Sequence, residues 1–145
     1  MAMATPTQST ERETQVAREA ATAFGRAFSE GDLDAFLDVL APEIEYEAPS
    51  VMQHTVMKLK GHDEVRRYLE ETTGEYEELR VETNDIRDKG GGRFVVVGQW
   101  HAQPRHTATP FGTPVGAVLD IDDGKVVRLR AFFDEALAEA AARRD

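Results

Sequence analysis

Two side chains in the first half of the chain could take part in chemistry on a small molecule. Tyr46 lies in residues 43–48, where glutamates alternate with apolar residues and so predict a strand with Tyr46 on its buried face. A buried phenol can donate a hydrogen bond to a ligand carbonyl oxygen, but a core tyrosine with a satisfied hydroxyl fits equally well. His54 lies in residues 49–60, a predicted irregular or extended, lid-like segment, where an imidazole can act as acid or base. A solvent-exposed loop histidine is the alternative.

Other patterns that commonly carry chemistry do not support a metal ion or a cofactor. The chain has no cysteine, and its four histidines are scattered. Residues 120–124 contain acids as a calcium loop does, but the twelfth position is Ala131 rather than glutamate. The glycines at 90–92 lack the Lys-Ser/Thr of a phosphate-binding loop. We therefore expect neither a metal site nor a cofactor.

Composition limits the classes of partner. A chain of 145 residues that is 41% hydrophobic and 30% charged is typical of one globular domain. The net charge of -10 disfavours nucleic acid and anionic membranes, which attract basic surfaces. The first ten residues lack the pattern of a secretory signal, and no apolar run has the length of a membrane span. These features predict a cytoplasmic protein with no nucleic-acid or membrane partner.

Helices are predicted mainly in the first half of a single domain, residues 10–145, which follows a disordered tail at residues 1–9. Thr10 and Glu13 have capping-box spacing, and apolar residues then recur at helical spacing until Gly31. Gly25 lies inside this helix, either as tolerated drift or because the helix approaches the sheet closely there. A short helix capped by Asp32 and a third helix from about residue 63 follow.

The second half predicts an antiparallel sheet. Strands are expected over residues 76–87, 93–103, 111–121 and 125–133, and Asp123-Gly124 is a strong hairpin signal. Asp134 caps an alanine-rich terminal helix. Helices followed by strands with this order indicate an α+β fold.

Alternation along these strands separates two sheet faces. One face is almost purely apolar and contains Phe94, Val96, Gly98, Trp100, Ala117, Leu119, Val127, Leu129, Ala131 and Phe133. The opposite face mixes apolar residues such as Val126 and Val97 with the polar residues Gln99, His101, Arg128 and Arg130. A solvated sheet face would hold fewer valines, so we expect this second face to form a homodimer contact.

Residues 31–49 and 122–134 together resemble the nuclear transport factor 2-like superfamily, which includes SnoaL-like polyketide cyclases and ketosteroid isomerases. The resemblance covers most of the chain. It implies a conical α+β fold, in which three helices pack on a curved, mostly antiparallel sheet around an apolar pocket and a short C-terminal helix follows. The superfamily hosts many reactions, so it implies a scaffold rather than a substrate.

Positions that carry chemistry in these relatives are vacant here. By the resemblance, the isomerases' general-base aspartate falls at Ala48, their oxyanion tyrosine at Phe24 and their protonated aspartic acid near Ala117. The aspartate of SnoaL-like cyclases falls in the stretch that ends at Ala131. Proton transfer by the isomerase mechanism is therefore excluded.

Two functions remain open. The first is the binding of a small apolar carbonyl compound, with isomerase, cyclase or dehydratase chemistry that rests on Tyr46 and His54 without an aspartate base. The second is a non-catalytic ligand-binding or dimeric assembly module with a closed pocket. The residues predicted to line the pocket are Phe24, Ala48, Tyr68, Trp100, Ala117, Leu129, Ala131 and Phe133. Trp100 and Tyr68 fit a filled core as well as a pocket wall.

Overall fold

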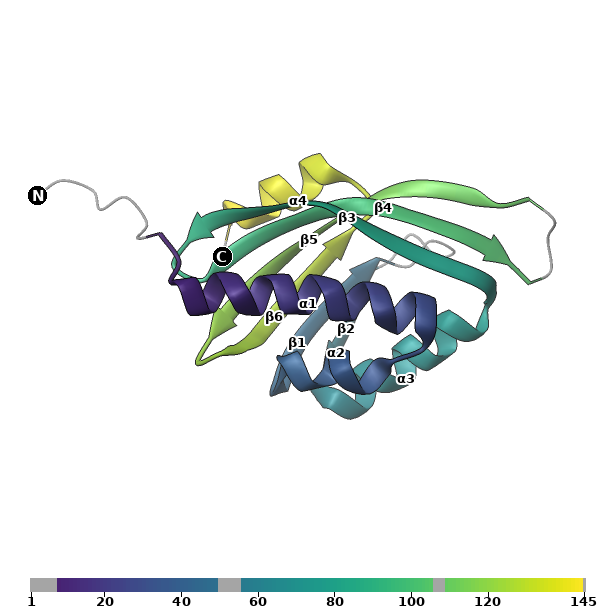
Figure 1. Ribbon diagram of the computed structural model, residues 1–145, viewed down its shortest axis with the longest axis horizontal. Coiled ribbons are helices and arrows are strands. Elements are labelled where there is room, and N and C mark those ends of the chain that lie inside the picture. The colour runs from purple at the N-terminus through teal and green to yellow at the C-terminus, as the bar shows by residue number, and fades with distance from the viewer. Residues whose placement is uncertain (1–7, 50–55, 106–108, 145) are drawn as a thin grey trace, which may run out of the picture.

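Four helices and six strands make up the described part of the chain, which is residues 8–49, 56–105 and 109–144 of a computed structural model (Figure 1). The helices are α1 (Glu11–Glu30), α2 (Leu33–Val39), α3 (Gly61–Gly74) and α4 (Glu135–Ala142). The strands are β1 (Leu40–Pro49), β2 (Val56–Lys60), β3 (Tyr76–Gly90), β4 (Arg93–Pro104), β5 (Phe111–Asp122) and β6 (Lys125–Phe132). They form one sheet in the order β2-β1-β6-β5-β4-β3, in which β1 and β6 are parallel and the other neighbours antiparallel. The predicted α+β fold is confirmed.

Helix α1 begins and ends as its sequence predicts. The Thr10 hydroxyl accepts a hydrogen bond from the Glu13 backbone at 3.1 Å, and the Glu13 carboxylate accepts one from the Thr10 backbone at 2.8 Å. The helix ends at Gly31, which has a φ of 72°. Its buried residues are Val16, Ala17, Ala20, Ala23, Ala27 and Phe28. Most of these are alanines, so the helix lies close to the sheet.

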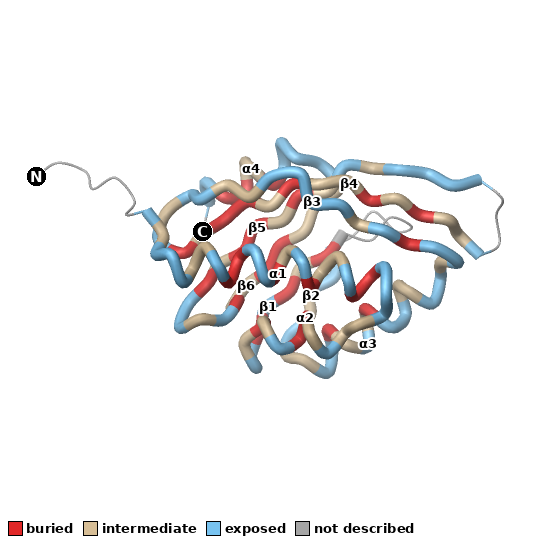
Figure 2. Tube along the Cα trace, viewed as in Figure 1, coloured by how far each residue is buried: buried red, intermediate tan, exposed pale blue. Residues whose placement is uncertain are grey.

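The helices lie on both faces of the sheet. Helices α1, α2 and α3 cover the inner face and enclose the main core, whereas α4 packs on the outer face over β4, β5 and β6 (Figure 1). In Figure 2 the buried segments follow the strands and the inward sides of these helices. No helix within the described ranges is long and apolar enough to cross a membrane.

Residues 56–60, expected to be irregular or extended, form the strand β2 and pair with β1 from Pro49↔Val56 to Glu45↔Lys60. One sequence-based expectation needs correction. Val126, expected on the outer face, belongs to the inner core. The register passes from Asp120↔Arg128 to Ile121↔Val126, so Val127 is an extra residue that reverses the alternation. A bulge of this kind leaves no mark in the pattern of apolar residues.

Helix α4 is fixed to the outer face by basic residues of the sheet. Arg87 forms ion pairs with Glu135 at 2.9 Å and Glu139 at 2.6 Å. At the other end of the helix, the Ala142 and Ala141 carbonyl oxygens accept hydrogen bonds from the Nη1 atoms of Arg93 and Arg130, at 3.1 Å and 3.2 Å. Positive charge at a helix C-terminus is favourable because the unpaired carbonyls there carry partial negative charge.

Arg130 is unusual because it is the only charged residue that is buried among those described. Among the described residues its Nε and Nη2 atoms have no hydrogen-bond acceptor, and Nη2 lies 4.0 Å from a carboxylate oxygen of Asp120. Burial, followed by the neighbouring charges of Arg128 and Arg93, lowers the pKa of its guanidinium from the ordinary value. The docking of α4 therefore carries an electrostatic cost at this position.

Two glycines allow close backbone approach on the inner side. A Cβ at Gly25 of α1 would lie 3.2 Å from the Val81 carbonyl oxygen of β3, which confirms that the helix approaches the sheet there. A Cβ at Gly98 of β4 would overlap the Glu82 carbonyl oxygen. This overlap follows from a bulge in β3 between Thr83 and Asp85, which pair with Gly98 and Val97.

We expect Gly98→Ala to lower the free energy of unfolding by about 1–3 kcal/mol, because the new methyl group must displace backbone rather than a flexible side chain. Gly74→Ala is the matched control, since a Cβ there has no neighbour within 4 Å. It should leave stability unchanged or raise it by up to about 1 kcal/mol through helix propensity. Urea unfolding measures both. Equal urea midpoints for the two variants would show that the β3 backbone next to Gly98 accommodates a methyl group without loss of stability.

Candidate functional site

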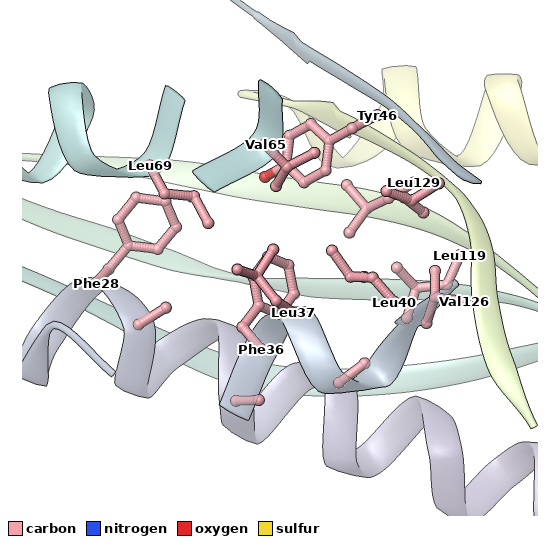
Figure 3. Close-up of a cluster of buried hydrophobic side chains, with 14 of the residues drawn as sticks. Phe28, Phe36, Leu37, Leu40, Tyr46, Val65, Leu69, Leu119, Val126 and Leu129 are labelled. Atoms are coloured by element: carbon pink, nitrogen blue, oxygen red, sulfur yellow. The ribbon is translucent and has the colours of Figure 1, made fainter. Parts of the chain in front are cut away.

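The residues predicted to line a pocket converge in one cluster between the inner helices and the sheet. Tyr46, Ala48, Trp100 and Leu129 are buried in this cluster. The others pack against it: Phe24, Tyr68, Ala117, Ala131 and Phe133. Figure 3 shows part of the cluster, with Tyr46 of β1 and Leu129 of β6 facing the side chains of α2 and α3. The sequence pattern therefore identified one continuous interior.

Trp100 lies inside a cage of aromatic rings and is 6% exposed. Its ring centroid lies 5.0 Å from that of Phe28, 5.9 Å from that of Phe133 and 6.2 Å from that of Tyr76, all in edge-on geometry. Such contacts add to the stabilisation that burial of aromatic area provides. Trp100 is thus a core residue in this structure, and it separates the deep interior from the rings nearer the surface.

Tyr46 is the polar group at the centre of this apolar interior. It is 2% exposed, and its hydroxyl makes no hydrogen bond with any described residue. Figure 3 shows the hydroxyl oxygen beside the side chain of Val65. Burial, and then the nearby Tyr68 at a ring distance of 5.9 Å, raises the pKa of the Tyr46 phenol well above its ordinary value. Tyr46 therefore stays protonated near neutral pH, and can donate a hydrogen bond but cannot act as a base.

A small apolar cavity lies between α1 and the sheet. Its volume is about 40 Å³, and four of the eight predicted pocket residues line it: Phe24, Ala117, Leu129 and Ala131. Pockets for drug-sized ligands usually measure roughly 300–1,000 Å³. The cavity as it stands can therefore hold only a small group, because aromatic rings fill most of the interior.

A wider groove opens at the ends of β3, β4 and β5. Its volume is about 760 Å³, and its apolar lining includes Phe28, Tyr76 and Phe111. The ring centroids of Tyr76 and Phe111 lie 6.5 Å apart, so aromatic rings continue from Trp100 to the surface. Sequence reasoning missed these residues, although alternation counted back from Ala117 along β5 places Phe111 on the inner face.

Interior carboxylates, which the isomerase-like mechanism requires, are not found among the described residues, where no aspartate or glutamate is buried. Ala48, Phe24 and Ala117 lie in or against the inner core, at the positions where the resemblance places catalytic groups. Residues 8–49, 56–105 and 109–144 also contain no group of three or more acidic or histidine side chains placed to hold a metal ion. The described interior offers neutral hydrogen-bond donors, the Tyr46 phenol and the Trp100 indole, within largely apolar walls.

The histidines lie away from this interior or outside the described residues. His54, the predicted acid or base, falls in the undescribed range 50–55. His62 Nε2 lies 3.0 Å from the Leu40 carbonyl oxygen, which ties α3 to the start of β1. His101 Nε2 lies 3.7 Å from a carboxylate oxygen of Glu82. The role predicted for His54 stays a prediction.

The outer face predicted to form a dimer contact is partly occupied by α4. Val97 packs in a cluster with alanines of α4, and Arg130 donates to the Ala141 carbonyl of that helix. Arg128 is half-buried, and its Nη2 atom lies 3.4 Å from a Glu47 carboxylate oxygen. Gln99 and His101 are partly exposed. The part of this face that α4 leaves uncovered is smaller than the sequence suggested.

Comparison with solved structures supports the fold across most of the chain. An NTF2-like protein of unknown function from Burkholderia pseudomallei is 25% identical, with a TM-score of 0.73 over 88% of this chain and 95% of that one. TerC, co-crystallised with polyporic acid, is 17% identical, with a TM-score of 0.70 over 92% of this chain and 100% of that one. A hypothetical protein from Catenulispora acidiphila with a ketosteroid isomerase-like fold, in complex with trimethylamine, is 15% identical, with a TM-score of 0.67 over 88% of this chain and 94% of that one.

A search of curated proteins finds no significant match. The family model described as the SnoaL-like domain matches residues 21–129. This range runs from the middle of α1 to β6 and includes Phe24, Tyr46, Trp100 and Ala117 of the interior. The inner helices, the sheet and the interior between them are thus parts of one known domain type, and the chain belongs to the SnoaL-like domain family.

Proposed function

We propose that this protein binds a small apolar carbonyl compound in its interior, where the Tyr46 phenol donates a hydrogen bond to the ligand's carbonyl oxygen. The observation that carries the proposal is the unpaired Tyr46 hydroxyl within the buried cluster. A ligand oxygen beside it would supply a hydrogen bond that the described residues do not. The interior therefore favours a ligand with one acceptor and an otherwise apolar surface.

The chemistry open to such a ligand is limited to reactions that a hydrogen-bond donor can assist. A phenol aimed at a carbonyl oxygen stabilises negative charge that develops there, as in an enolate. The described interior supplies no carboxylate to remove a proton, so an isomerase, cyclase or dehydratase reaction would need His54 or the ligand itself as the base. Ligand binding is thus the primary function in this proposal, and turnover depends on a group outside the described interior.

Entry of a carbonyl compound requires movement of aromatic rings. The cavity beside α1 holds about 40 Å³, whereas the groove at the ends of β3 to β5 holds about 760 Å³. The rings of Phe28, Trp100 and Tyr76 lie between the deep interior and this groove. A ligand that enters from the groove must therefore change the surroundings of Trp100.

Two solved structures with this fold support a small-molecule role. TerC was co-crystallised with polyporic acid, and the Catenulispora protein is in complex with trimethylamine. Both are less than 25% identical to this chain, so they support a ligand-binding use of the scaffold and leave the ligand of this protein to experiment.

The second candidate function is a non-catalytic module with a closed pocket that assembles as a homodimer. The small cavity and the caged Trp100 favour it. On the outer face, Glu45 and Glu47 of β1 lie beside Arg128 of β6, whereas Arg130 is buried under α4. Adjacent acidic and basic side chains can pair with each other across a two-fold axis, which would suit a second copy of the chain.

The prediction for ligand entry concerns Trp100, the single tryptophan of the chain. Titration with a panel of apolar carbonyl compounds should change its fluorescence saturably, because the ligand displaces the rings around it. Acrylamide quenching of the free protein serves as the control for burial. A flat response across the panel, with emission that is blue-shifted and shielded from quencher, would contradict the proposal and favour the closed-pocket module.

The prediction for Tyr46 separates a ligand donor from an ordinary core tyrosine. Without ligand, Tyr46→Phe should change the free energy of unfolding by less than about 1 kcal/mol, because the hydroxyl makes no hydrogen bond with the described residues. It should also weaken binding of the best compound by roughly 2- to 12-fold, the value of one net hydrogen bond. Tyr68→Phe, on the adjacent ring, should affect binding less. Thermal unfolding and the Trp100 titration measure the two effects. Loss of stability with unchanged affinity would show that Tyr46 is structural.

The prediction for assembly concerns Arg128 and the glutamates beside it on the outer face. If the uncovered part of this face forms a homodimer, Arg128→Glu should shift the solution mass toward monomer, since it places like charges beside Glu47. Arg26→Glu, at an exposed position of α1, is the matched charge reversal and should not change the mass. Light scattering after gel filtration gives the mass. A wild-type protein that is monomeric at every concentration tested rules out the dimer.

A further inference from the structure

The cavity beside α1 owes its existence to small residues on two opposing walls. Ala20 and Ala21 form the helix side, while Gly98, Ala117 and Ala131 form the sheet side. Each of these residues ends at or before Cβ, whereas larger apolar residues such as Phe24, Val81 and Leu129 complete the lining. The cavity is therefore a property of this set of residues rather than of one loose contact.

The sheet wall cannot be closed from Gly98. The bulge in β3 places the Glu82 carbonyl oxygen where a Cβ of residue 98 would lie. The Glu82 carboxylate itself points outward, where it pairs with Arg80 at 3.2 Å. Residue 98 therefore cannot carry a side chain unless the β3 backbone moves, so Gly98 adds no side chain to the wall.

Size and polarity limit what the cavity can hold. Except for Glu82 and Thr83, its lining residues are apolar or glycine. A buried water needs two to four polar partners, and apolar cavities stay dry. An engineered apolar cavity of about 150 Å³ accepts benzene. That volume is several times the 40 Å³ of the cavity found here. A volume of 40 Å³ suits an apolar group of one or two heavy atoms and excludes a ring.

We propose that this cavity is a subsite for a terminal methyl or ethyl group. It would hold the apolar end of the ligand proposed above. The identity of the rest of the ligand rests on the proposed function, but the cavity can be tested without that ligand. The inference adds a size limit to the ligand class: a short alkyl end, unbranched and without a ring.

Xenon is the first probe, because it is a single apolar atom. Methyl resonances of Ala117, Ala131 and Leu129 should shift saturably as xenon pressure rises, while those of Ala138 on α4 should not. Benzene at matched concentrations should produce no saturable shift. Absence of a xenon response at the cavity methyls, or a benzene response equal to that of xenon, would overturn the proposal.

Filling the cavity is the second arm of the experiment. Ala117→Val should abolish the xenon response, and Ala21→Val should do the same from the helix wall, so the test survives if one variant fails to fold. Ala102→Val is the matched control, since Ala102 is buried on β4 but does not line the cavity. Retention of xenon binding in both filling variants, or its loss in the control alone, would contradict the assignment.

A pair of ligands that differ by one terminal methylene links the subsite to the proposed function. In the wild type, an ethyl ketone should bind about fourfold more tightly than the matching methyl ketone, which is the value of one buried methylene. Ala117→Val should remove this preference. If xenon binds but the Trp100 titration is flat, the subsite stands and the proposed carbonyl ligand is refuted. If ketones bind but xenon produces no response, the carbonyl ligand stands and the subsite is refuted.

Discussion

The close packing of α1 on the sheet is the constraint on which the rest of the interior depends. Alanines make up most of the buried side of this helix, and a Cβ added to Gly25 would lie only 3.2 Å from the β3 backbone. At this separation large side chains cannot lie between helix and sheet along most of α1. Phe24, Phe28 and Phe36 therefore gather at one end of the interface, where they stack edge-on.

This arrangement decides what the interior can do. Aromatic rings around Trp100 fill the wide part, small residues leave a narrow cavity, and acids are not found in the described interior. A buried carboxylate would need partners to offset the loss of solvation, and the alanines at 48 and 117 remove that need. The Tyr46 hydroxyl then lies within the inner core without a hydrogen bond to any described residue, and polar groups without partners in a core commonly mark functional positions.

The outer face shows a different balance between packing and charge. Helix α4 covers Val95, Val97 and Val118 with alanines, which contribute little area each, and it is held by ion pairs and by arginine donors at its C-terminal end. Arg130 gains one carbonyl partner there and leaves two of its nitrogens without an acceptor. The attachment of α4 thus depends on charge more than the attachment of α1 does.

Sequence alone determined the class of fold, the helix caps, the hairpin at Asp123-Gly124 and the residues that meet in the interior, because these follow from local periodicity and local hydrogen bonds. The tight turn is observed with φ values of 51° and 75°, as the sequence predicted. Only the tertiary structure decided the inward position of Val126, the pairing of β2, the cover that α4 forms and the size of the cavity. Each of these depends on register or on the distance between segments remote in sequence, and a bulge of one residue at Val127 or near Thr83 changes both without altering composition or periodicity nearby.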